Sequence, residues 1–233
     1  MVPQGRVTVR RRGVTLIEVL VVIVIIAVLA AMGFPLIRGM RESADAATCM
    51  SNLRQVGMAL NMYAGDHGQK YPALQPETSH ETGERGDIWP GLVARAGYLW
   101  NYEGDLPCGT GIWTCPSCDF MSNAYGGYGV VEDAVFVYGE KYPTGSEERG
   151  SLRISRIERP ADTWLVGDAC QKAEETNKGW YAIWSKPSKW ESGHPPAERH
   201  GGKANVCMVD GHVEALSMKE VEERKATYDV IID

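Results

Sequence analysis

The chain has 233 residues, of which 44% are hydrophobic and 23% are charged. This composition is ordinary for a globular protein and excludes wholesale disorder and collagen-like repetition. The formal net charge of −6 argues against a general nucleic-acid-binding protein.

The N-terminal segment differs in charge from the rest of the chain. Residues 1–13 hold four arginines and no acid, whereas the remaining chain holds 20 Lys and Arg against 30 Asp and Glu. An apolar run of 21 residues follows at 14–34, long enough to cross a bilayer as a helix. A basic head before such a run predicts a single-pass membrane protein whose head stays in the cytoplasm and whose acidic body lies outside.

Glu18 is the one charged residue inside the apolar run. A secretory signal peptide cleaved near Ala30 and a plain membrane anchor are both compatible with the run. Neither explains Glu18, because a carboxylate inside a membrane costs about 2.5–3.5 kcal/mol on insertion scales and usually marks a partner.

The residues around Glu18 read Gly13-Val14-Thr-Leu-Ile-Glu18. They resemble the processing site of the type IV prepilin family, which includes the pseudopilins of type II secretion. The resemblance implies that a prepilin peptidase cuts after Gly13 and that the new amine of Val14 is methylated. Family members usually carry Phe where this chain has Val14, and Pro35 falls where they often have a helix-kinking proline. Glu18 is then the assembly residue, because it can neutralise the amine of a neighbouring subunit in a bundle of such helices.

The helical pattern continues beyond Pro35. Apolar residues recur at spacings of three and four through Leu53, Val56, Leu60 and Tyr63, which predicts one buried helix face. A helix from residue 14 to a stop at Gly65 would be about 75 Å long. We therefore divide the chain into four segments: a cleaved leader at 1–13, a transmembrane and assembly helix at 14–35, an amphipathic continuation at 36–65, and a globular extracytoplasmic head at 66–233.

The head contains short apolar runs separated by turn residues, and these runs predict strands. Asp210-Gly211 between two alternating segments predicts a hairpin with a type I′ turn. The predicted fold class is α+β and pilin-like, with a long N-terminal helix packed on a mostly antiparallel sheet with long loops. The predicted strands are 130–138, 163–166, 181–184, 205–209 and 212–216.

His200 and Asp210 form the pattern His-x9-Asp-Gly. This pattern resembles the C-terminal signature of a prepilin-like subfamily, and the stretch 159–168 ending in Asp168 fits it as well. Asp168, His200 and Asp210, together with His212, could converge on a metal such as Ca or Zn. His together with Asp suits Zn or Mn better, because Ca prefers oxygen ligands alone. The alternative is that Asp210 caps its own turn and His200 anchors a loop by hydrogen bonds.

Three cysteines lie close in sequence, at Cys108, Cys115 and Cys118. They could form disulfides, which an extracytoplasmic location favours, or stay free. They could also bind zinc, which would require a fourth ligand such as Cys49 or a histidine. A thioredoxin-type redox pair fits poorly, because turn residues follow the second cysteine.

No enzyme motif is present, so we expect a structural protein rather than an enzyme. The leading hypothesis is a prepilin-like subunit of a type II secretion pseudopilus or a type IV pilus-like filament in the bacterial inner membrane. Its expected partners are the prepilin peptidase, other pilin or pseudopilin subunits, the inner-membrane assembly platform and the membrane itself, without nucleic acid. The alternative is an anchored metal- or carbohydrate-binding module that uses the prepilin export route without polymerising. A membrane-bound zinc hydrolase built around His200 is a weaker third hypothesis.

Overall fold

A computed structural model describes residues 14–74, 88–99, 111–118, 127–132, 135–136, 153–173, 175–184, 190–191 and 193–223. The chain divides into two compact units, Met1–Arg41 and Glu42–Asp233. The helix α1 (Leu16–Asp66) has 51 residues and contributes to both units. The long N-terminal helix predicted from the sequence is therefore present, and its backbone continues through Pro35.

The first unit contains the apolar part of α1. From Val14 to Met32 the large apolar side chains are exposed, with values between 49% and 84%. Within the described residues, no helix combines the length and the apolarity that a membrane crossing requires.

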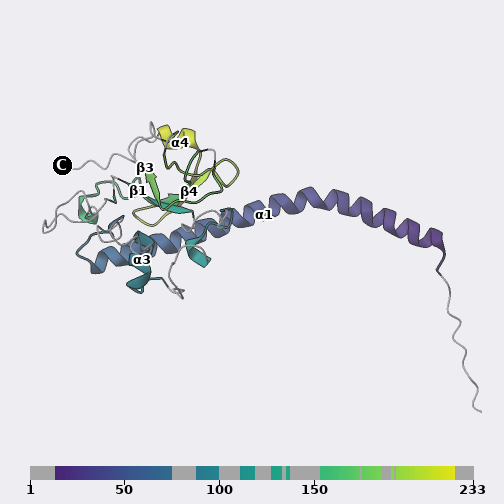
Figure 1. The fold of residues 1–233 in the computed structure, drawn as a ribbon, viewed down its shortest axis with the longest axis horizontal. Coiled ribbons are helices and arrows are strands. Elements are labelled where there is room, and N and C mark those ends of the chain that lie inside the picture. Colours follow the sequence, from purple (N-terminus) through teal and green to yellow (C-terminus); the bar gives the residue numbers. More distant parts are fainter. Residues whose placement is uncertain are drawn as a thin grey trace, which may run out of the picture. The chain divides into compact units, whose positions relative to one another are not determined.

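The second unit is built on a five-stranded sheet in the order β3-β1-β2-β4-β5. Three of these strands, β1, β3 and β4, are labelled in Figure 1. Three of the four pairings are antiparallel, and β1 and β3 run parallel. All five predicted strands overlap an observed one, although the ends are displaced, and residues 133–134 and 137–138 of the first predicted strand lie outside the described residues. The strands are β1 (Tyr128–Glu132), β2 (Trp164–Asp168), β3 (Ala182–Trp184), β4 (Ala204–Met208) and β5 (Val213–Leu216).

The sheet is buried on both faces. The C-terminal part of α1 packs on one face, where Leu53 and Val56 share a core with Val130 of β1. On the other face Val131 of β1 shares a second core with Val221 of α4 (Met218–Glu223). Neighbouring residues of β1 therefore point into opposite cores, as the pleat of a strand requires. The short α3 (Trp89–Arg95) adds buried Trp89 to the first core.

The structure corrects the predicted turn between β4 and β5. A type I′ turn needs positive φ at both central residues, and only Gly211 of the pair Asp210-Gly211 has it, at 93°. Gly211 N–H donates to the carbonyl of Met208 and Met208 N–H donates to the carbonyl of His212, both at 2.9 Å. The loop is thus a three-residue connection with glycine in the left-handed position, in which the preceding aspartate keeps an ordinary conformation.

A second tight turn precedes β4. Gly201 and Gly202 both have positive φ, at 62° and 75°, and the backbone groups of His200 and Lys203 exchange two hydrogen bonds of 3.1 and 3.2 Å. This is the geometry that a type I′ turn requires, and only glycine adopts it without steric cost at both positions. The turn fixes His200 at its first position.

Candidate functional site

The first candidate site is the start of α1. Gly13 lies outside the described residues, and Val14 is 73% exposed. The backbone N–H and the hydroxyl of Thr15 both donate to one carboxylate oxygen of Glu18, each at 2.7 Å. Glu18 N–H lies 3.4 Å from the Thr15 hydroxyl oxygen in return. Thr15 and Glu18 therefore form a capping box, which satisfies backbone donors at a helix start.

The capping box gives Glu18 a role within its own chain, in addition to the assembly role that the resemblance implies. The signal was available, because Thr followed three residues later by Glu before an apolar run is the sequence pattern of such a cap. The pairing of Glu18 with the amine of a neighbouring subunit stays a prediction.

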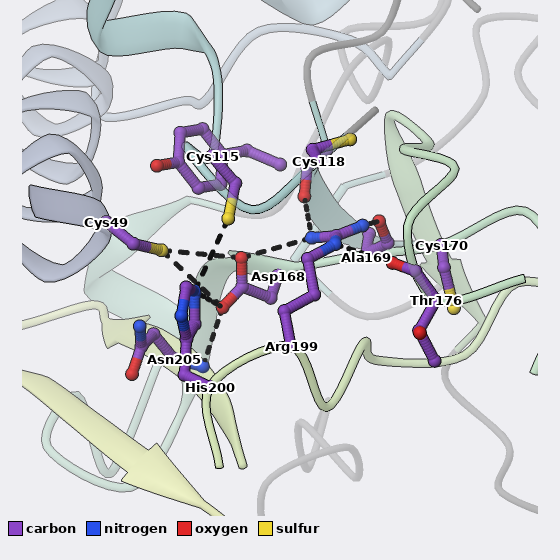
Figure 2. Close-up of polar contacts among 12 residues, drawn as sticks. Cys49, Cys115, Cys118, Asp168, Ala169, Cys170, Thr176, Arg199, His200 and Asn205 are labelled. Atoms are coloured by element: carbon purple, nitrogen blue, oxygen red, sulfur yellow. Dashed lines mark hydrogen bonds and ion pairs between the residues drawn. The ribbon is translucent and has the colours of Figure 1, made fainter. Parts of the chain in front are cut away.

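The second candidate site is a buried polar cluster in the second unit. It comprises Cys49 from α1, Cys115 after the 3₁₀ turn Gly111–Trp113, Asp168 at the end of β2, and His200 before β4. All four side chains are buried, and one potential ligand atom from each lies within 4.8 Å of the others. Figure 2 shows the side chains of Cys49, Cys115 and His200 gathered around the carboxylate of Asp168.

The distances within the cluster are short. Cys49 Sγ lies 3.4 and 3.5 Å from the two oxygens of Asp168, to which its thiol donates. His200 Nε2 lies 3.5 Å from Asp168 Oδ2 and 3.3 Å from Cys115 Sγ. Each of the four side chains therefore contacts at least one other member.

Asp168 is held from outside the cluster by two further donors. Asn205 N–H on β4 donates to Oδ2 at 2.9 Å, and Arg199 Nη1 donates to Oδ1 at 3.2 Å. The Arg199 side chain is almost completely buried and also donates to the backbone carbonyls of Gly127, Thr176 and Ala169. Such a pair is stable only because each charge has several partners.

The surroundings raise the pKa of two buried thiols at the site, Cys115 and Cys170. The hydrogen bond with Cys49 and burial together raise the pKa of Cys115, and burial raises the pKa of nearby Cys170 to about 12. Burial would lower the pKa of His200, but its contact with Cys115 and the charge of Asp168 raise it. A nucleophilic cysteine needs a depressed pKa and access to substrate, so this arrangement does not favour a catalytic thiol.

Several buried polar atoms in and next to the cluster lack hydrogen-bond partners among the described residues. They include His200 Nδ1 and both side-chain polar atoms of Asn205. His200 thus contacts the cluster through Nε2, and within the described part of the chain its other ring nitrogen has no hydrogen bond.

The structure brings some of the sequence-predicted residues together and separates others. Asp168, His200 and Cys115 share the cluster, whereas Asp210 accepts hydrogen bonds from His212 N–H at 3.1 Å and from the His212 ring at 2.6 Å. The thiol of Cys118 donates to the carbonyl of Asn177 at 3.2 Å. Cys108 lies outside the described residues.

The sequence alone gives little indication that Cys49 and Arg199 belong to the site. Cys49 entered the sequence reasoning only as one possible fourth ligand, because it lies far from the other cysteines in the chain. Arg199 was not singled out, although it directly precedes His200 and a buried cluster with Asp168 requires a compensating cation.

Comparison with known proteins identifies the class to which the N-terminus belongs. Residues 9–34 match the family model of the prokaryotic N-terminal methylation motif. The start of α1 therefore carries the methylation motif that the resemblance around Gly13 and Glu18 implies.

The relatives that the chain resembles are proteins of type II secretion systems. The chain is 41% identical over 66 residues to type II secretion system core protein G of Pectobacterium carotovorum subsp. carotovorum, a match that covers 28% of this chain and 42% of the relative. It is 43% identical over 67 residues to the protein of the same name from Escherichia coli (strain K12), covering 29% of this chain and 46% of the relative. The N-terminal part of the chain is therefore similar to that of type II secretion pseudopilins, which supports the resemblance to the prepilin and pseudopilin family.

The similarity is limited in extent. The chain spans less than half the length of the curated relatives it matches, and the matches cover 28–29% of the chain. No solved structure matches the chain. The comparisons give no support to the alternative of a binding module that does not polymerise.

Proposed function

We propose that the chain is a subunit of a pseudopilus-like filament, processed after Gly13, methylated on Val14 and assembled through α1. The observation that carries this proposal is the methylation motif at residues 9–34, followed by similarity to type II secretion system core proteins G. The role is structural rather than enzymatic. The partners are the prepilin peptidase, other pseudopilin subunits and the inner-membrane assembly platform.

The surface of α1 supports this proposal. Its large apolar side chains between Val14 and Met32 are about half exposed or more. Exposed apolar surface on this scale is removed from water by lipid or by other helices. Before assembly the inner membrane covers it, with the basic leader on the cytoplasmic side and the head outside. In the filament the equivalent helices of neighbouring subunits cover it.

The charge of Glu18 determines how the α1 helices of neighbouring subunits align along the filament. Cleavage creates an ammonium group at Val14, four positions before Glu18. An unpaired charge in apolar surroundings is unfavourable, so a subunit that places its Glu18 against the amine of its neighbour is stabilised relative to other registers.

The mass of the mature chain tests processing. Intact mass spectrometry of the membrane form should show loss of residues 1–13 and the added mass of one methyl group. A mature chain that begins at any residue other than Val14 would contradict the proposal.

Two variants separate the local role of Glu18 from its role in assembly. Gln at the third helical position also forms a capping box, so Glu18→Gln keeps the cap and removes only the charge. Thr15→Ala weakens the cap and leaves the charge. We expect Glu18→Gln to be cleaved normally but to lose filament formation, and Thr15→Ala to retain it, both measured by shear fractionation and electron microscopy. Normal filaments from Glu18→Gln would refute the charge pairing.

A further inference from the structure

We propose that Cys49, Cys115, Asp168 and His200 bind one Zn²⁺ ion in the head. This inference is independent of filament assembly, because all four residues belong to the second unit. None of the relatives' names refers to a metal, and their matches cover 28–29% of the chain.

The spacing of the donor atoms fits a tetrahedral zinc site. Zn–S bonds of about 2.3 Å and Zn–N or Zn–O bonds of about 2.0–2.2 Å place neighbouring ligand atoms about 3.4–3.8 Å apart in a tetrahedron. Three of the six donor pairs lie at 3.3 Å for Cys115 and His200, 3.5 Å for His200 and Asp168, and 3.4–3.5 Å for Cys49 and Asp168. The remaining pairs lie within 4.8 Å, so that a modest movement of the side chains would complete the tetrahedron.

The charges also fit a divalent cation. The Asp168 carboxylate and the Arg199 guanidinium already form a buried ion pair. Both cysteines bind Zn²⁺ as thiolates and release their protons to solvent, so that two thiolates and one carboxylate balance the ion and Arg199. With His200 bound as neutral imidazole, the loaded site has no net charge, and no uncompensated charge is created in the interior.

The four donor atoms indicate which metal the site would bind. Two sulfurs, one imidazole nitrogen and one carboxylate oxygen suit Zn²⁺, whereas Ca²⁺ takes six to eight oxygen ligands. Of the metals considered from the sequence, this cluster therefore fits Zn rather than Ca. Four protein ligands leave no open position, which is typical of a structural site rather than a catalytic one.

The surrounding hydrogen bonds orient the ligands. Asn205 N–H and Arg199 each donate to one oxygen of Asp168, which fixes the plane of the carboxylate. Carboxylate ligands of metal sites are commonly held by such outer donors. The turn Gly201-Gly202 holds His200 next to them. The ion would join α1 to the sheet and to the segment that carries Cys115.

Metal content of the full-length protein tests the proposal. The detergent-solubilised chain would be purified with a reducing agent, stripped with a chelator and dialysed against zinc. We expect one zinc per chain by elemental mass spectrometry and a raised melting temperature relative to the stripped protein. Wild-type protein without stoichiometric zinc would overturn the proposal.

A pair of cysteine variants locates the site. Cys118 belongs to the same Cys-x-x-Cys segment as Cys115 but is not one of the four proposed ligands. Cys118→Ser should therefore keep the zinc, and Cys49→Ser should lose it together with the zinc-dependent rise in melting temperature. Loss of zinc in Cys118→Ser, or its retention in Cys49→Ser, would overturn the assignment.

Cobalt binding to the wild-type protein tests the proposal even if Cys49→Ser does not fold. Wild-type protein loaded with Co²⁺ should show the visible bands of tetrahedral coordination and a thiolate-to-cobalt absorption in the near ultraviolet. Their absence would overturn the proposal. So would a Cys49–Cys115 disulfide in peptide maps of the native protein together with failure of the reduced protein to bind either metal.

Discussion

Asp168 lies at a position where loss of the carboxylate charge should strongly lower the stability of the head. It is completely buried and pairs with Arg199, whose side chain is also buried. Removing one partner of a buried ion pair leaves the other charge uncompensated, at a cost of about 3–5 kcal/mol.

We therefore expect Asp168→Asn to lower the melting temperature of the reduced, metal-free protein by about 6–20 °C, measured by circular dichroism. Exposed Asp162 offers a matched control, and Asp162→Asn should change the free energy of unfolding by less than about 0.5 kcal/mol. Equal effects of the two substitutions would show that the buried pair does not matter.

His212 provides a residue-scale test of pH dependence. Its ring nitrogens face Glu214 at 2.8 Å and Asp210 at 2.6 Å, and these carboxylates raise its pKa, with the larger effect from Glu214. A raised pKa stabilises the fold fully below the unfolded value of 6.5, and this stabilisation is lost as the pH rises through the raised pKa.

His212→Gln should therefore destabilise the head more at about pH 5.5 than at about pH 9, measured as the difference in melting temperature from wild type. Glu214→Gln should weaken the pH dependence of the wild-type protein. A His212→Gln effect that is the same at both pH values would contradict this account.

Sequence reasoning found the buried residues that lie within recognisable patterns. Asp168 and His200 were singled out because of the motifs around them, and Cys115 because of its neighbour Cys118. Cys49 and Arg199 could not be assigned to the cluster in the same way. Cys49 is 119 positions from Asp168, and only the packing of α1 on the sheet brings the two side chains together.

At the scale of elements, the close approach of α1 to β4 depends on Gly57. A Cβ atom at this position would lie 2.4 Å from the sulfur of Cys207 on β4. Real Cβ contacts are never this short, so a larger residue would push the helix away from the sheet or displace the cysteine.

Gly57→Ala should destabilise the head by about 1–3 kcal/mol. Gly65 is an informative control, because it lies in the same helix and a Cβ there meets nothing within 4 Å. Gly65→Ala should be neutral or should stabilise by up to about 1 kcal/mol through helix propensity. Thermal unfolding of both variants compares them directly, and a Gly57→Ala protein as stable as wild type would contradict the close packing.

The strands were predictable from alternation and turn residues, but their pairing was not. The hairpin of β4 and β5 is local, so its existence followed from Asp210-Gly211, although the turn type did not. The parallel contact of β1 with β3 joins segments about 50 residues apart. Such a pairing depends on both cores being filled at once, which local patterns do not report.

At the scale of the whole molecule, the head should fold without the apolar part of α1. Both core clusters consist of residues from Cys49 onward. A fragment that begins at Met40 should therefore unfold cooperatively on heating, observed by calorimetry. A fragment without a cooperative transition would show that the head depends on the segment before it.

The N-terminal segment was more predictable than the head, because its function depends on short-range sequence. Its charge pattern, apolar length and the Gly13–Glu18 motif lie within adjacent positions, and the matched family model covers the same stretch. The role of the head depends on residues assembled from distant parts of the chain, for which a single sequence gives few constraints.

The cluster of Cys49, Cys115, Asp168 and His200 draws on four distant stretches of the chain. Until the stretch around position 200 has been synthesised, Cys49 and Cys115 lack the full set of side chains that surround them in the folded head, and their thiols stay accessible to oxidants. The order of synthesis thus leaves a period in which wrong cross-links can form. Closure of the cluster late in folding therefore leaves both thiols exposed for most of the time that the head takes to form.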